Sequence, residues 1–181
     1  MSYVYWNNMQ IIGLSGTKRS GKDTVCRLMQ EIARKGRLKR EAFADNLKQE
    51  VADMLNVKIE MIEQDKERFR PMLQWYGADY CRHYFGKSYW IDQMFDKVRH
   101  NYENKQITVI TDVRYPNEAH FIRSRGVLVN VERDTGLKDS HSSENALKDF
   151  DGYDYTINNN EGLEELKEKV QKLFCEIEAI A

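Results

Sequence analysis

One stretch near the N-terminus, residues 16–24, constrains the fold more than any other part of the chain. It reads G-T-K-R-S-G-K-D-T, follows the apolar run from Met9 to Leu14, and precedes a helical pattern. Two glycines separated by four residues and followed by a lysine make up most of a phosphate-binding loop. Glycine lets such a loop turn tightly, and the loop amides and the N-terminus of the next helix then face an anion. The stretch therefore predicts a strand, a phosphate-binding loop and a helix in succession.

The charged residues of this loop have expected roles. Lys22 supplies a mobile positive charge for the terminal phosphates of a bound nucleotide. The usual pattern ends in Ser or Thr, whose hydroxyl binds Mg²⁺, whereas Asp23 takes that place here and Thr24 follows. The alternative interpretation is an ordinary glycine-rich turn in which Lys18, Arg19 and Lys22 are exposed to solvent.

The composition fits one domain of ordinary size without a strong charge bias. The 181 residues are 41% hydrophobic, which allows a sizeable core. A net charge of -1 gives no support for nucleic acid as a partner. No signal-peptide pattern opens the chain and no apolar run approaches the roughly 20 residues of a membrane helix, so we expect a soluble, cytoplasmic protein without a membrane partner.

The cysteines give no sign of a disulfide framework or a metal site. Their number is odd and they lack metal-ligand spacing, which indicates buried thiols in a reducing compartment. They are Cys26, Cys81 and Cys175.

Segments with strand and helix patterns alternate along the chain. This order predicts an α/β fold, a parallel sheet flanked by helices on both faces, in a single domain over residues 1–181. Apolar runs place strands at 9–15, 40–44, 107–112, 127–131 and 153–158. Helical periodicity places helices at 23–34, 45–55, 59–64, 69–85, 89–104, 117–125 and 161–180.

Two segments interrupt this alternation. Residues 59–104 carry helices and no strand, and we interpret them as a helical flap over the carboxyl ends of the strands, where such folds bind ligands. Residues 133–152 are polar and irregular, with one candidate helical turn near 143–147, and could close over a bound nucleotide as a lid. The apolar side chains expected to face the core include Met54, Trp75, Tyr80 and Leu163.

A carboxylate and an arginine stand at the end of the strand at 107–112. In a parallel sheet Asp112 would emerge beside the phosphate-binding loop, where it could hold Mg²⁺; otherwise it caps the following turn. Arg114 can fork onto a phosphate because its planar donors match phosphate oxygens. Glu118 could accept hydrogen bonds from a sugar hydroxyl or a base, hold Arg114, or form a plain surface ion pair.

Arginines and aromatic residues are mixed in the helical segment. Arg68 and Arg70 precede Pro71, and six tyrosine and tryptophan residues follow, up to Trp90. Rings stack on bases, so this mixture suits a base-and-phosphate pocket, although such a stripe is more often core. Gly77 in mid-helix costs about 1 kcal/mol relative to alanine, which suggests close approach by another backbone or a ligand. These tyrosines and tryptophans are Trp75, Tyr76, Tyr80, Tyr84, Tyr89 and Trp90.

Together these residues resemble the bacteriophage deoxynucleoside monophosphate kinases, a branch of the P-loop kinase fold. The resemblance spans nearly the whole chain, and its most specific parts are the G-K-D variant of the loop and the Asp-x-Arg element. The matching stretches are S-G-T-K-R-S-G-K-D-T from Ser15, M-L-Q-W-Y-G-A-D from Met72, Tyr89-Trp90, D-V-R-Y-P-N-E from Asp112, the polar loop with His141 and Glu144, and the ending from Asp154 through Asn158 to G-L-E-E-L at Gly162.

The resemblance implies transfer of the ATP γ-phosphate to a deoxynucleoside 5′-monophosphate, with Mg²⁺ as cofactor. It implies catalytic roles for Lys22, Asp23 and Arg114, and Mg²⁺ at Asp23 and Asp112. The implied ATP-binding residues are Gly16, Lys18, Arg19, Ser20, Gly21, Lys22, Asp23, Thr24, Arg133 and Asn158. The implied acceptor-binding residues are Lys18, Arg70, Gly77, Trp90, Asp112, Arg114 and Glu118.

Other functions and an assembly stay open at this point. Dephospho-coenzyme A kinases look similar, but usually carry Ser-Thr after the loop lysine. A nucleotide-binding module could also switch conformation without phosphorylating anything. Trp75 and Ala78 depart from the side chains expected in the family, which leaves the accepted base open. The exposed face of the helices at 69–85 and 89–104 could serve a homodimer.

Overall fold

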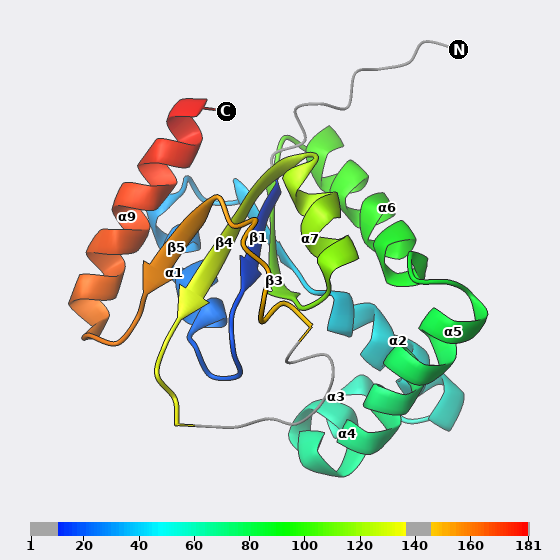
Figure 1. The fold of residues 1–181 in the computed structure, drawn as a ribbon. Helices are drawn as coiled ribbons and strands as arrows, with labels where there is room; N and C mark the ends of the chain where they lie inside the picture. The colour runs from blue at the N-terminus through cyan, green and yellow to red at the C-terminus, as the bar shows by residue number, and fades with distance from the viewer. Residues whose placement is uncertain (1–10, 137–145, 181) are drawn as a thin grey trace. The chain divides into compact units, whose positions relative to one another are not determined.

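The described part of the chain forms a five-stranded sheet in which all neighbouring strands are parallel. The computed structural model describes residues 11–136 and 146–180 (Figure 1). The strands are β1 (Ile11–Ser15), β2 (Leu38–Glu41), β3 (Ile107–Val113), β4 (Gly126–Glu132) and β5 (Tyr155–Asn158). Their order is β2-β3-β1-β4-β5, so the parallel sheet flanked by helices that the sequence predicts is confirmed.

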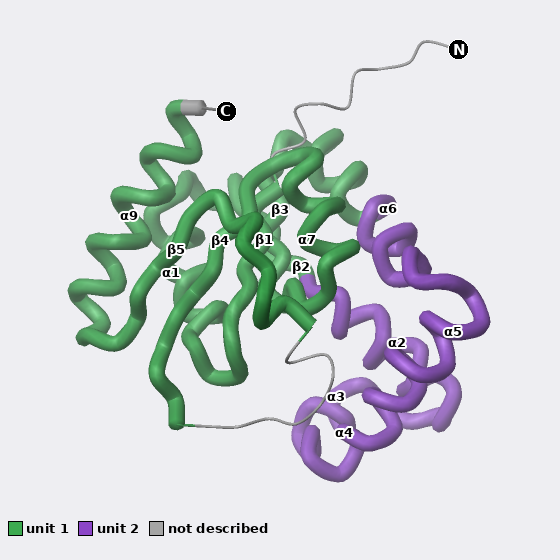
Figure 2. Tube along the Cα trace, viewed as in Figure 1, with its two compact units in different colours: residues 1–41, 97–181 green, residues 42–96 purple. Residues whose placement is uncertain are grey.

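The described residues form two compact units (Figure 2). The sheet unit contains the described residues of 1–41 and 97–181, and the helical unit contains residues 42–96. The helical unit begins and ends earlier in the chain than the flap expected at 59–104. The expected position of that flap over the strand ends stays a prediction.

Helices cover both faces of the sheet in the sheet unit. Ile12 and Leu14 of β1 are buried in one cluster with residues of α1 and α9, so these two helices cover one face. On the other face, a Cβ at Gly13 would lie 2.5 Å from Ile122 Cδ1, so the absence of a side chain there lets α7 approach β1. The helices are α1 (Lys22–Ile32), α7 (Pro116–Arg123), α9 (Leu163–Ile180) and the second part of α6 (Tyr89–Glu103).

Two predicted boundaries of this unit are wrong for local reasons. The strand expected at 40–44 lies at Leu38–Glu41, because Ala42 is already the N-cap of the next helix. Gly126, expected to close the helix at 117–125, is instead the first residue of β4. A Cβ on Gly126 would lie 2.0 Å from Ile11 O, so the pairing of β4 with β1 itself requires glycine.

The helical unit is built from short helices around a small apolar core. Val51, Ala52 and Ile62 are fully buried there, and Leu47 and Phe69 pack against them. The elements are α2 (Phe43–Leu55), α3 (Ile59–Gln64), α4 (Lys66–Gln74), a π-helix (Trp75–Cys81), α5 (Arg82–Tyr84) and the first part of α6.

The single helix expected at 69–85 is wrong in two respects. Helix α4 begins at Lys66, because the Asp65 carboxylate accepts a hydrogen bond from Arg68 N at 3.4 Å and so caps its N-terminus. The π-helix at Trp75–Cys81 then interrupts the α-helical repeat. Its wider turn changes which side chains share a face, and π-helical turns of this kind are frequent at functional sites.

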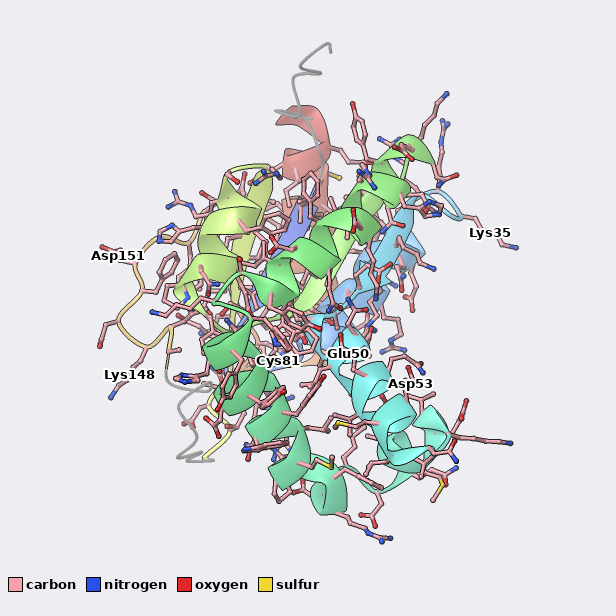
Figure 3. The ribbon with its side chains drawn as sticks, turned by 90° about the vertical axis from the view of Figure 1, so that its right-hand side faces the viewer. Lys35, Glu50, Asp53, Cys81, Lys148 and Asp151 are labelled. Carbon is pink, nitrogen blue, oxygen red and sulfur yellow. The ribbon has the colours of Figure 1, made fainter. Side chains whose placement is uncertain are left out.

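One carboxylate, Glu50 on α2, joins three elements of the helical unit. It accepts hydrogen bonds from the hydroxyls of Tyr76 (3.0 Å) and Tyr89 (3.0 Å) and from the Gln93 amide (2.7 Å). Figure 3 labels Glu50 together with the buried Cys81, whose thiol pKa is raised by burial and also by this carboxylate. The pKa of each tyrosine is raised, mainly by burial and next by the hydrogen bond to Glu50. For Tyr89 the pKa reaches about 12. Both hydroxyls therefore remain donors at neutral pH.

Several apolar residues expected in the core are exposed instead. Met54 in the last turn of α2 is 51% exposed and Leu163 at the start of α9 is 55% exposed, because helix ends extend beyond their packing partners. Trp75 is 51% exposed at the point where the π-helix begins. Tyr80 is half-buried, with its ring centroid 5.5 Å from that of Trp75.

The prediction of buried thiols is confirmed for two of the three cysteines. Cys26 and Cys81 are buried, whereas Cys175 is exposed on α9, so the prediction is wrong for Cys175. Burial raises the pKa of the Cys26 thiol to about 11, which keeps it protonated at neutral pH. Among the described helices, none combines the length and the apolar composition that crossing a bilayer requires.

Candidate active site

The residues between β1 and α1 form the loop that the sequence predicts. Positive φ angles occur at Gly16 (138°), Arg19 (64°) and Gly21 (102°), so the backbone turns sharply within a few residues. A Cβ on Gly16 would lie 2.2 Å from Val131 O of β4, which leaves room for glycine alone. Gly21 is the N-cap of α1 and offers no side chain to its amides. The N-terminus of α1 therefore lies at the loop where the sequence predicts an anion site, and anion binding there stays a prediction.

Lys22 places its charge over this loop. Its Nζ donates to Gly16 O (2.7 Å) and Thr17 O (2.8 Å), and lies 3.5 Å from Ser20 Oγ. Ser20 is fully buried, and its amide donates to Thr17 O at 3.1 Å. The ammonium group and the glycine-rich backbone thus form one compact cationic turn.

Asn159, directly after β5, braces the loop and was missed by the sequence reasoning. Its buried Nδ2 donates to Ser20 O at 2.7 Å, and a Cβ on Gly21 would lie 2.4 Å from the same nitrogen. Asn158, the residue expected near ATP, is exposed, and its Oδ1 accepts a bond from Asn160 N at 3.1 Å. In the sequence, Asn159 has the same parity as Tyr155 and Ile157, and this period-2 pattern of a strand is a signal that favours Asn159 over Asn158 as the inward residue.

The ends of β1 and β3 lie side by side at the start of the loop. Ser15 pairs with Val113, and the register shifts after Gly13 because β3 carries one more residue than β1 over this stretch. Asp112 lies in this β-bulge and is half-buried. Bulges re-aim side chains and are common next to active sites. The register brings Asp112 near the residue that precedes the loop, and both the direction of its side chain and its part in binding Mg²⁺ stay predictions.

Glu118 fixes the backbone that carries Arg114. Its carboxylate accepts hydrogen bonds from Arg114 N (2.9 Å) and Tyr115 N (3.1 Å), and the residue is only 2% exposed. Of the alternatives left open by the sequence, this geometry favours the one in which Glu118 holds Arg114, through its backbone. A buried carboxylate at the start of α7 thus sets the point from which the exposed Arg114 side chain extends.

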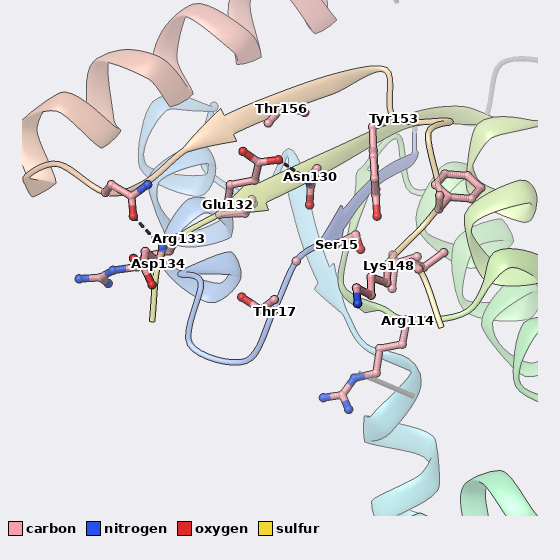
Figure 4. A pocket seen from close by; sticks show the side chains of 16 residues that line it. Ser15, Thr17, Arg114, Asn130, Glu132, Arg133, Asp134, Lys148, Tyr153 and Thr156 are labelled. Atoms are coloured by element: carbon pink, nitrogen blue, oxygen red, sulfur yellow. Dashed lines mark hydrogen bonds between the residues drawn. The ribbon is translucent and has the colours of Figure 1, made fainter. Parts of the chain in front are cut away.

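A cavity of about 690 Å³ lies next to the loop in the sheet unit (Figure 4). Ser15, Asn130 and Thr156 line it and pair with one another across β1, β4 and β5, so they form one row near the carboxyl edge of the sheet. Paired residues of neighbouring strands present their side chains on the same face, which makes this row a polar wall. The sequence-predicted site residues that line the cavity are Gly16, Arg114 and Arg133.

Three predicted acceptor residues lie in the helical unit. Arg70 donates from Nε and a terminal nitrogen to the two carboxylate oxygens of Glu67, at 3.0 and 2.8 Å. Trp90 is 4% exposed, and its indole nitrogen donates to Gly77 O at 2.9 Å. A Cβ on Gly77 would lie 2.8 Å from Leu47 Cδ2, so a leucine side chain is the close neighbour that the glycine accommodates. The part of these residues in acceptor binding stays a prediction.

Asp23 is accessible in the first turn of α1. Its side chain is 85% exposed, and Oδ1 lies 4.0 Å from Arg40 Nε, a pair too exposed to hold it firmly. Within the described part of the chain, no group of three or more His, Cys, Asp or Glu residues could hold a metal. Mg²⁺ commonly takes one or two carboxylates and completes its shell with water and substrate phosphates, so Asp23 and Asp112 fit that kind of site.

The remaining predicted residues lie in or near the loop and β4. Arg19 is exposed and Lys18 is half-buried in the loop, Thr24 is half-buried in α1, and Arg133 is exposed after β4. His141, Glu144 and the candidate helical turn near 143–147 fall wholly or mainly outside the described residues. The idea that 133–152 acts as a lid stays a prediction.

Sequence comparisons agree on one family. The family model for deoxynucleotide monophosphate kinase matches residues 45–170. A protein of Acanthamoeba polyphaga mimivirus, provisionally named a deoxynucleotide monophosphate kinase, is 30% identical over 190 residues, covering 90% of this chain and 94% of the relative. The span matched by the family model begins after the phosphate-binding loop, so that similarity does not depend on the widespread loop motif.

Solved structures share the fold at low sequence identity. The protein TT1252 from Thermus thermophilus matches with a TM-score of 0.54 and 15% identity, over 92% of this chain and 97% of that one. A shikimate kinase from Aquifex aeolicus matches with a TM-score of 0.48 and 18% identity, over 93% and 98% of the two chains. The first similarity concerns the fold alone, and the second is too loose to support a conclusion.

Proposed function

The chain belongs to the deoxynucleotide monophosphate kinase family, and on that basis we propose that it transfers the γ-phosphoryl group of ATP to a deoxynucleoside 5′-monophosphate. The observation that carries this proposal is the register of β1 with β3, in which Ser15 pairs with Val113. Asp112 and Arg114 flank Val113 in sequence, so they adjoin the residue of β3 that pairs with Ser15, directly before the phosphate-binding loop. A phosphoryl donor on the loop would then lie next to an arginine that can bind the phosphate of an acceptor.

The chemistry needs positioning more than proton transfer. The acceptor phosphate has a second pKa near 6, so it is largely dianionic at neutral pH and needs no strong general base. One of its oxygens forms a bond to the γ-phosphorus, the bond to the β–γ bridging oxygen breaks, and ADP leaves with that oxygen. Charge neutralisation and in-line alignment therefore supply most of the catalysis.

Each residue has an assigned part in that alignment. The amides of the loop, from Gly16 to Thr24, and the Lys22 ammonium bind the donor phosphates. Arg114, held by Glu118, binds the acceptor phosphate. When bound, Mg²⁺ would be held by Asp112, with Asp23 acting through water, and would neutralise phosphate charge.

The remaining assignments follow the family match. Lys18 would serve both nucleotides. Arg70, Gly77 and Trp90 of the helical unit would face the acceptor, and Arg133 would lie near the ATP end. We also assign Asn158 to that end, beside the buried Asn159 that braces the loop.

A coupled assay of ADP formation tests the proposal. Purified full-length chain is given ATP and Mg²⁺ with a panel of acceptors: four deoxynucleoside monophosphates, their ribonucleotide counterparts and dephospho-coenzyme A. We expect ADP only when ATP, Mg²⁺ and a deoxynucleoside monophosphate are all present. ADP with dephospho-coenzyme A alone would assign another acceptor. Slow ADP release independent of any acceptor would favour a nucleotide-binding switch.

A further inference from the structure

A lysine that no part of the proposed mechanism uses lines the cavity beside the phosphate-binding loop. Lys148 shares this cavity with Arg114, Arg133 and Thr17. In the view of Figure 4, its side chain is drawn between Ser15 and Arg114. Among the described residues, three cationic side chains line the cavity, and the sequence pointed to two of them, Arg114 and Arg133.

The segment that carries Lys148 is anchored to the sheet unit. The Phe150 ring contacts that of His120 on α7 (5.9 Å between centroids) and that of Tyr153 (5.2 Å). Asp154 exchanges two hydrogen bonds with Leu128 of β4: its carboxylate accepts from Leu128 N at 2.8 Å, and its amide donates to Leu128 O at 2.9 Å. Lys148 therefore extends from a segment that is packed against α7 and β4.

The described acidic residues that line the cavity are Glu132 and Asp134, and each accepts a hydrogen bond from a neighbouring group. Glu132 accepts a bond from Asn130 Nδ2 at 2.9 Å, and Asp134 accepts one from Gly136 N at 3.2 Å. Within the described part of the chain, no hydrogen bond or ion pair involves the Lys148 ammonium. Its charge is therefore available to a ligand in the cavity. Lys148 and Arg114 are both cationic and lie beside the phosphate-binding loop, so the ligand group they suit best is a phosphate.

We propose that Lys148 binds a phosphate group of the nucleotide held in this cavity, together with Arg114. This inference rests on the proposed phosphoryl transfer and adds a residue to it. Lysine acts as a compact point charge on a flexible stem, so it can follow a phosphate whose position shifts during transfer. A charge-assisted contact of this kind typically changes affinity or rate by about tenfold or more.

Three variants test the role of Lys148. Lys148→Met removes the charge and keeps the length of the stem, Lys148→Arg retains the charge, and Lys167→Met removes an exposed lysine of α9 as the matched control. We expect Lys148→Met to lower kcat/KM by about tenfold or more, and this decrease should be larger at low than at high salt concentration, because salt screens the charge. Lys148→Arg should restore most of the loss, and all three variants should keep the wild-type melting temperature.

A binding measurement separates this inference from the proposed function. Calorimetric titration with a deoxynucleoside monophosphate and with ATP, each in the absence of the other, involves no turnover, so it tests Lys148 even if no phosphoryl transfer occurs. We expect weaker binding of at least one probe to Lys148→Met than to Lys167→Met. Equal behaviour of these two variants in both kinetics and binding would overturn the inference. So would a loss that Lys148→Arg does not restore and that accompanies a lower melting temperature.

Discussion

The two units of this protein hold their polar groups in different ways. In the sheet unit, backbone groups set the shape of the phosphate-binding loop. The φ angles of Gly16, Arg19 and Gly21 are positive, and two backbone carbonyl oxygens accept hydrogen bonds from Lys22. In the helical unit, the organising group is a side chain, the Glu50 carboxylate, which receives donors from Tyr76, Tyr89 and Gln93.

This difference implies that the loop of the sheet unit serves ligand binding, whereas the Glu50 network of the helical unit serves stability. A loop of backbone amides presents many weak donors to an anion, and removing one side chain leaves its shape largely intact. When one carboxylate accepts from several donors, a single substitution disrupts all of these hydrogen bonds, because each donor loses its acceptor. Substitutions in the sheet unit should therefore reduce activity, whereas substitutions in the Glu50 network should reduce stability.

The largest effect is expected for Lys22→Met. Removal of the ammonium group takes away charge that stabilises the transferring phosphoryl group, so kcat/KM should fall by roughly 100- to 1,000-fold. The melting temperature should stay near that of the wild type. Lys35→Met, at an exposed turn, is the control for loss of a lysine. Near-normal turnover of Lys22→Met in the coupled assay would contradict the role of the loop in phosphoryl transfer.

Glu50→Ala should have the next largest effect, on stability. Two tyrosine hydroxyls and one amide lose their acceptor, which should lower the free energy of unfolding by about 2–3 kcal/mol. Urea denaturation followed by circular dichroism measures this loss. Glu60→Ala on α3, an exposed carboxylate of the same unit, should change stability by less than about 0.5 kcal/mol. Equal effects of the two substitutions would contradict a special role for Glu50.

Arg114→Ala should produce a smaller effect that is specific to one substrate. Loss of the guanidinium should raise KM for the deoxynucleoside monophosphate by about tenfold and change KM for ATP much less. Steady-state kinetics with each substrate varied in turn measure the split. Arg34→Ala, at an exposed position after α1, is the control. Unchanged acceptor kinetics would mean that Arg114 has been assigned to the wrong phosphate.

The smallest effect is a loss of stability in alkaline solution. Because the pKa of Tyr89 is raised from 10.0 to about 12, the unfolded chain releases this proton at a lower pH than the folded chain. The contribution of Tyr89 to stability is therefore complete below pH 10 and is lost as pH rises through about 12. Chemical denaturation between pH 9 and about 12 should show this decline, and Tyr89→Phe should flatten it. An equal slope in both proteins would assign the decline to other groups.

The accuracy of the sequence reasoning differs between the two units for a physical reason. The loop from Gly16 to Thr24 is contiguous, and its backbone geometry follows from residue types that are neighbours in sequence. Asp112 and Arg114 could be placed because parallel strands end at one edge of a sheet. The β-bulge at Asp112 could not be predicted, because it depends on the register of β3 against β1.

The missed residues depend on contacts between distant parts of the chain. Asn159 reaches Ser20 across 139 positions, and Glu50 meets Tyr89 across 39. Trp75 and the helix at 69–85 were misjudged because a π-helix changes the repeat that a regular pattern assumes. Lys148 gave no sequence signal, because a lysine in a polar stretch resembles any other solvated lysine.

The sequence by itself determined the strand–loop–helix unit, the alternation that yields a parallel sheet, and the residues that follow β3. Each of these depends on local backbone preference or on a repeat along the chain. The tertiary structure decided which asparagine braces the loop, that Glu50 joins α2 with the π-helix and α6, and that Lys148 lines the cavity with Arg114. These depend on strand register and on packing between segments far apart in sequence, which no local pattern encodes.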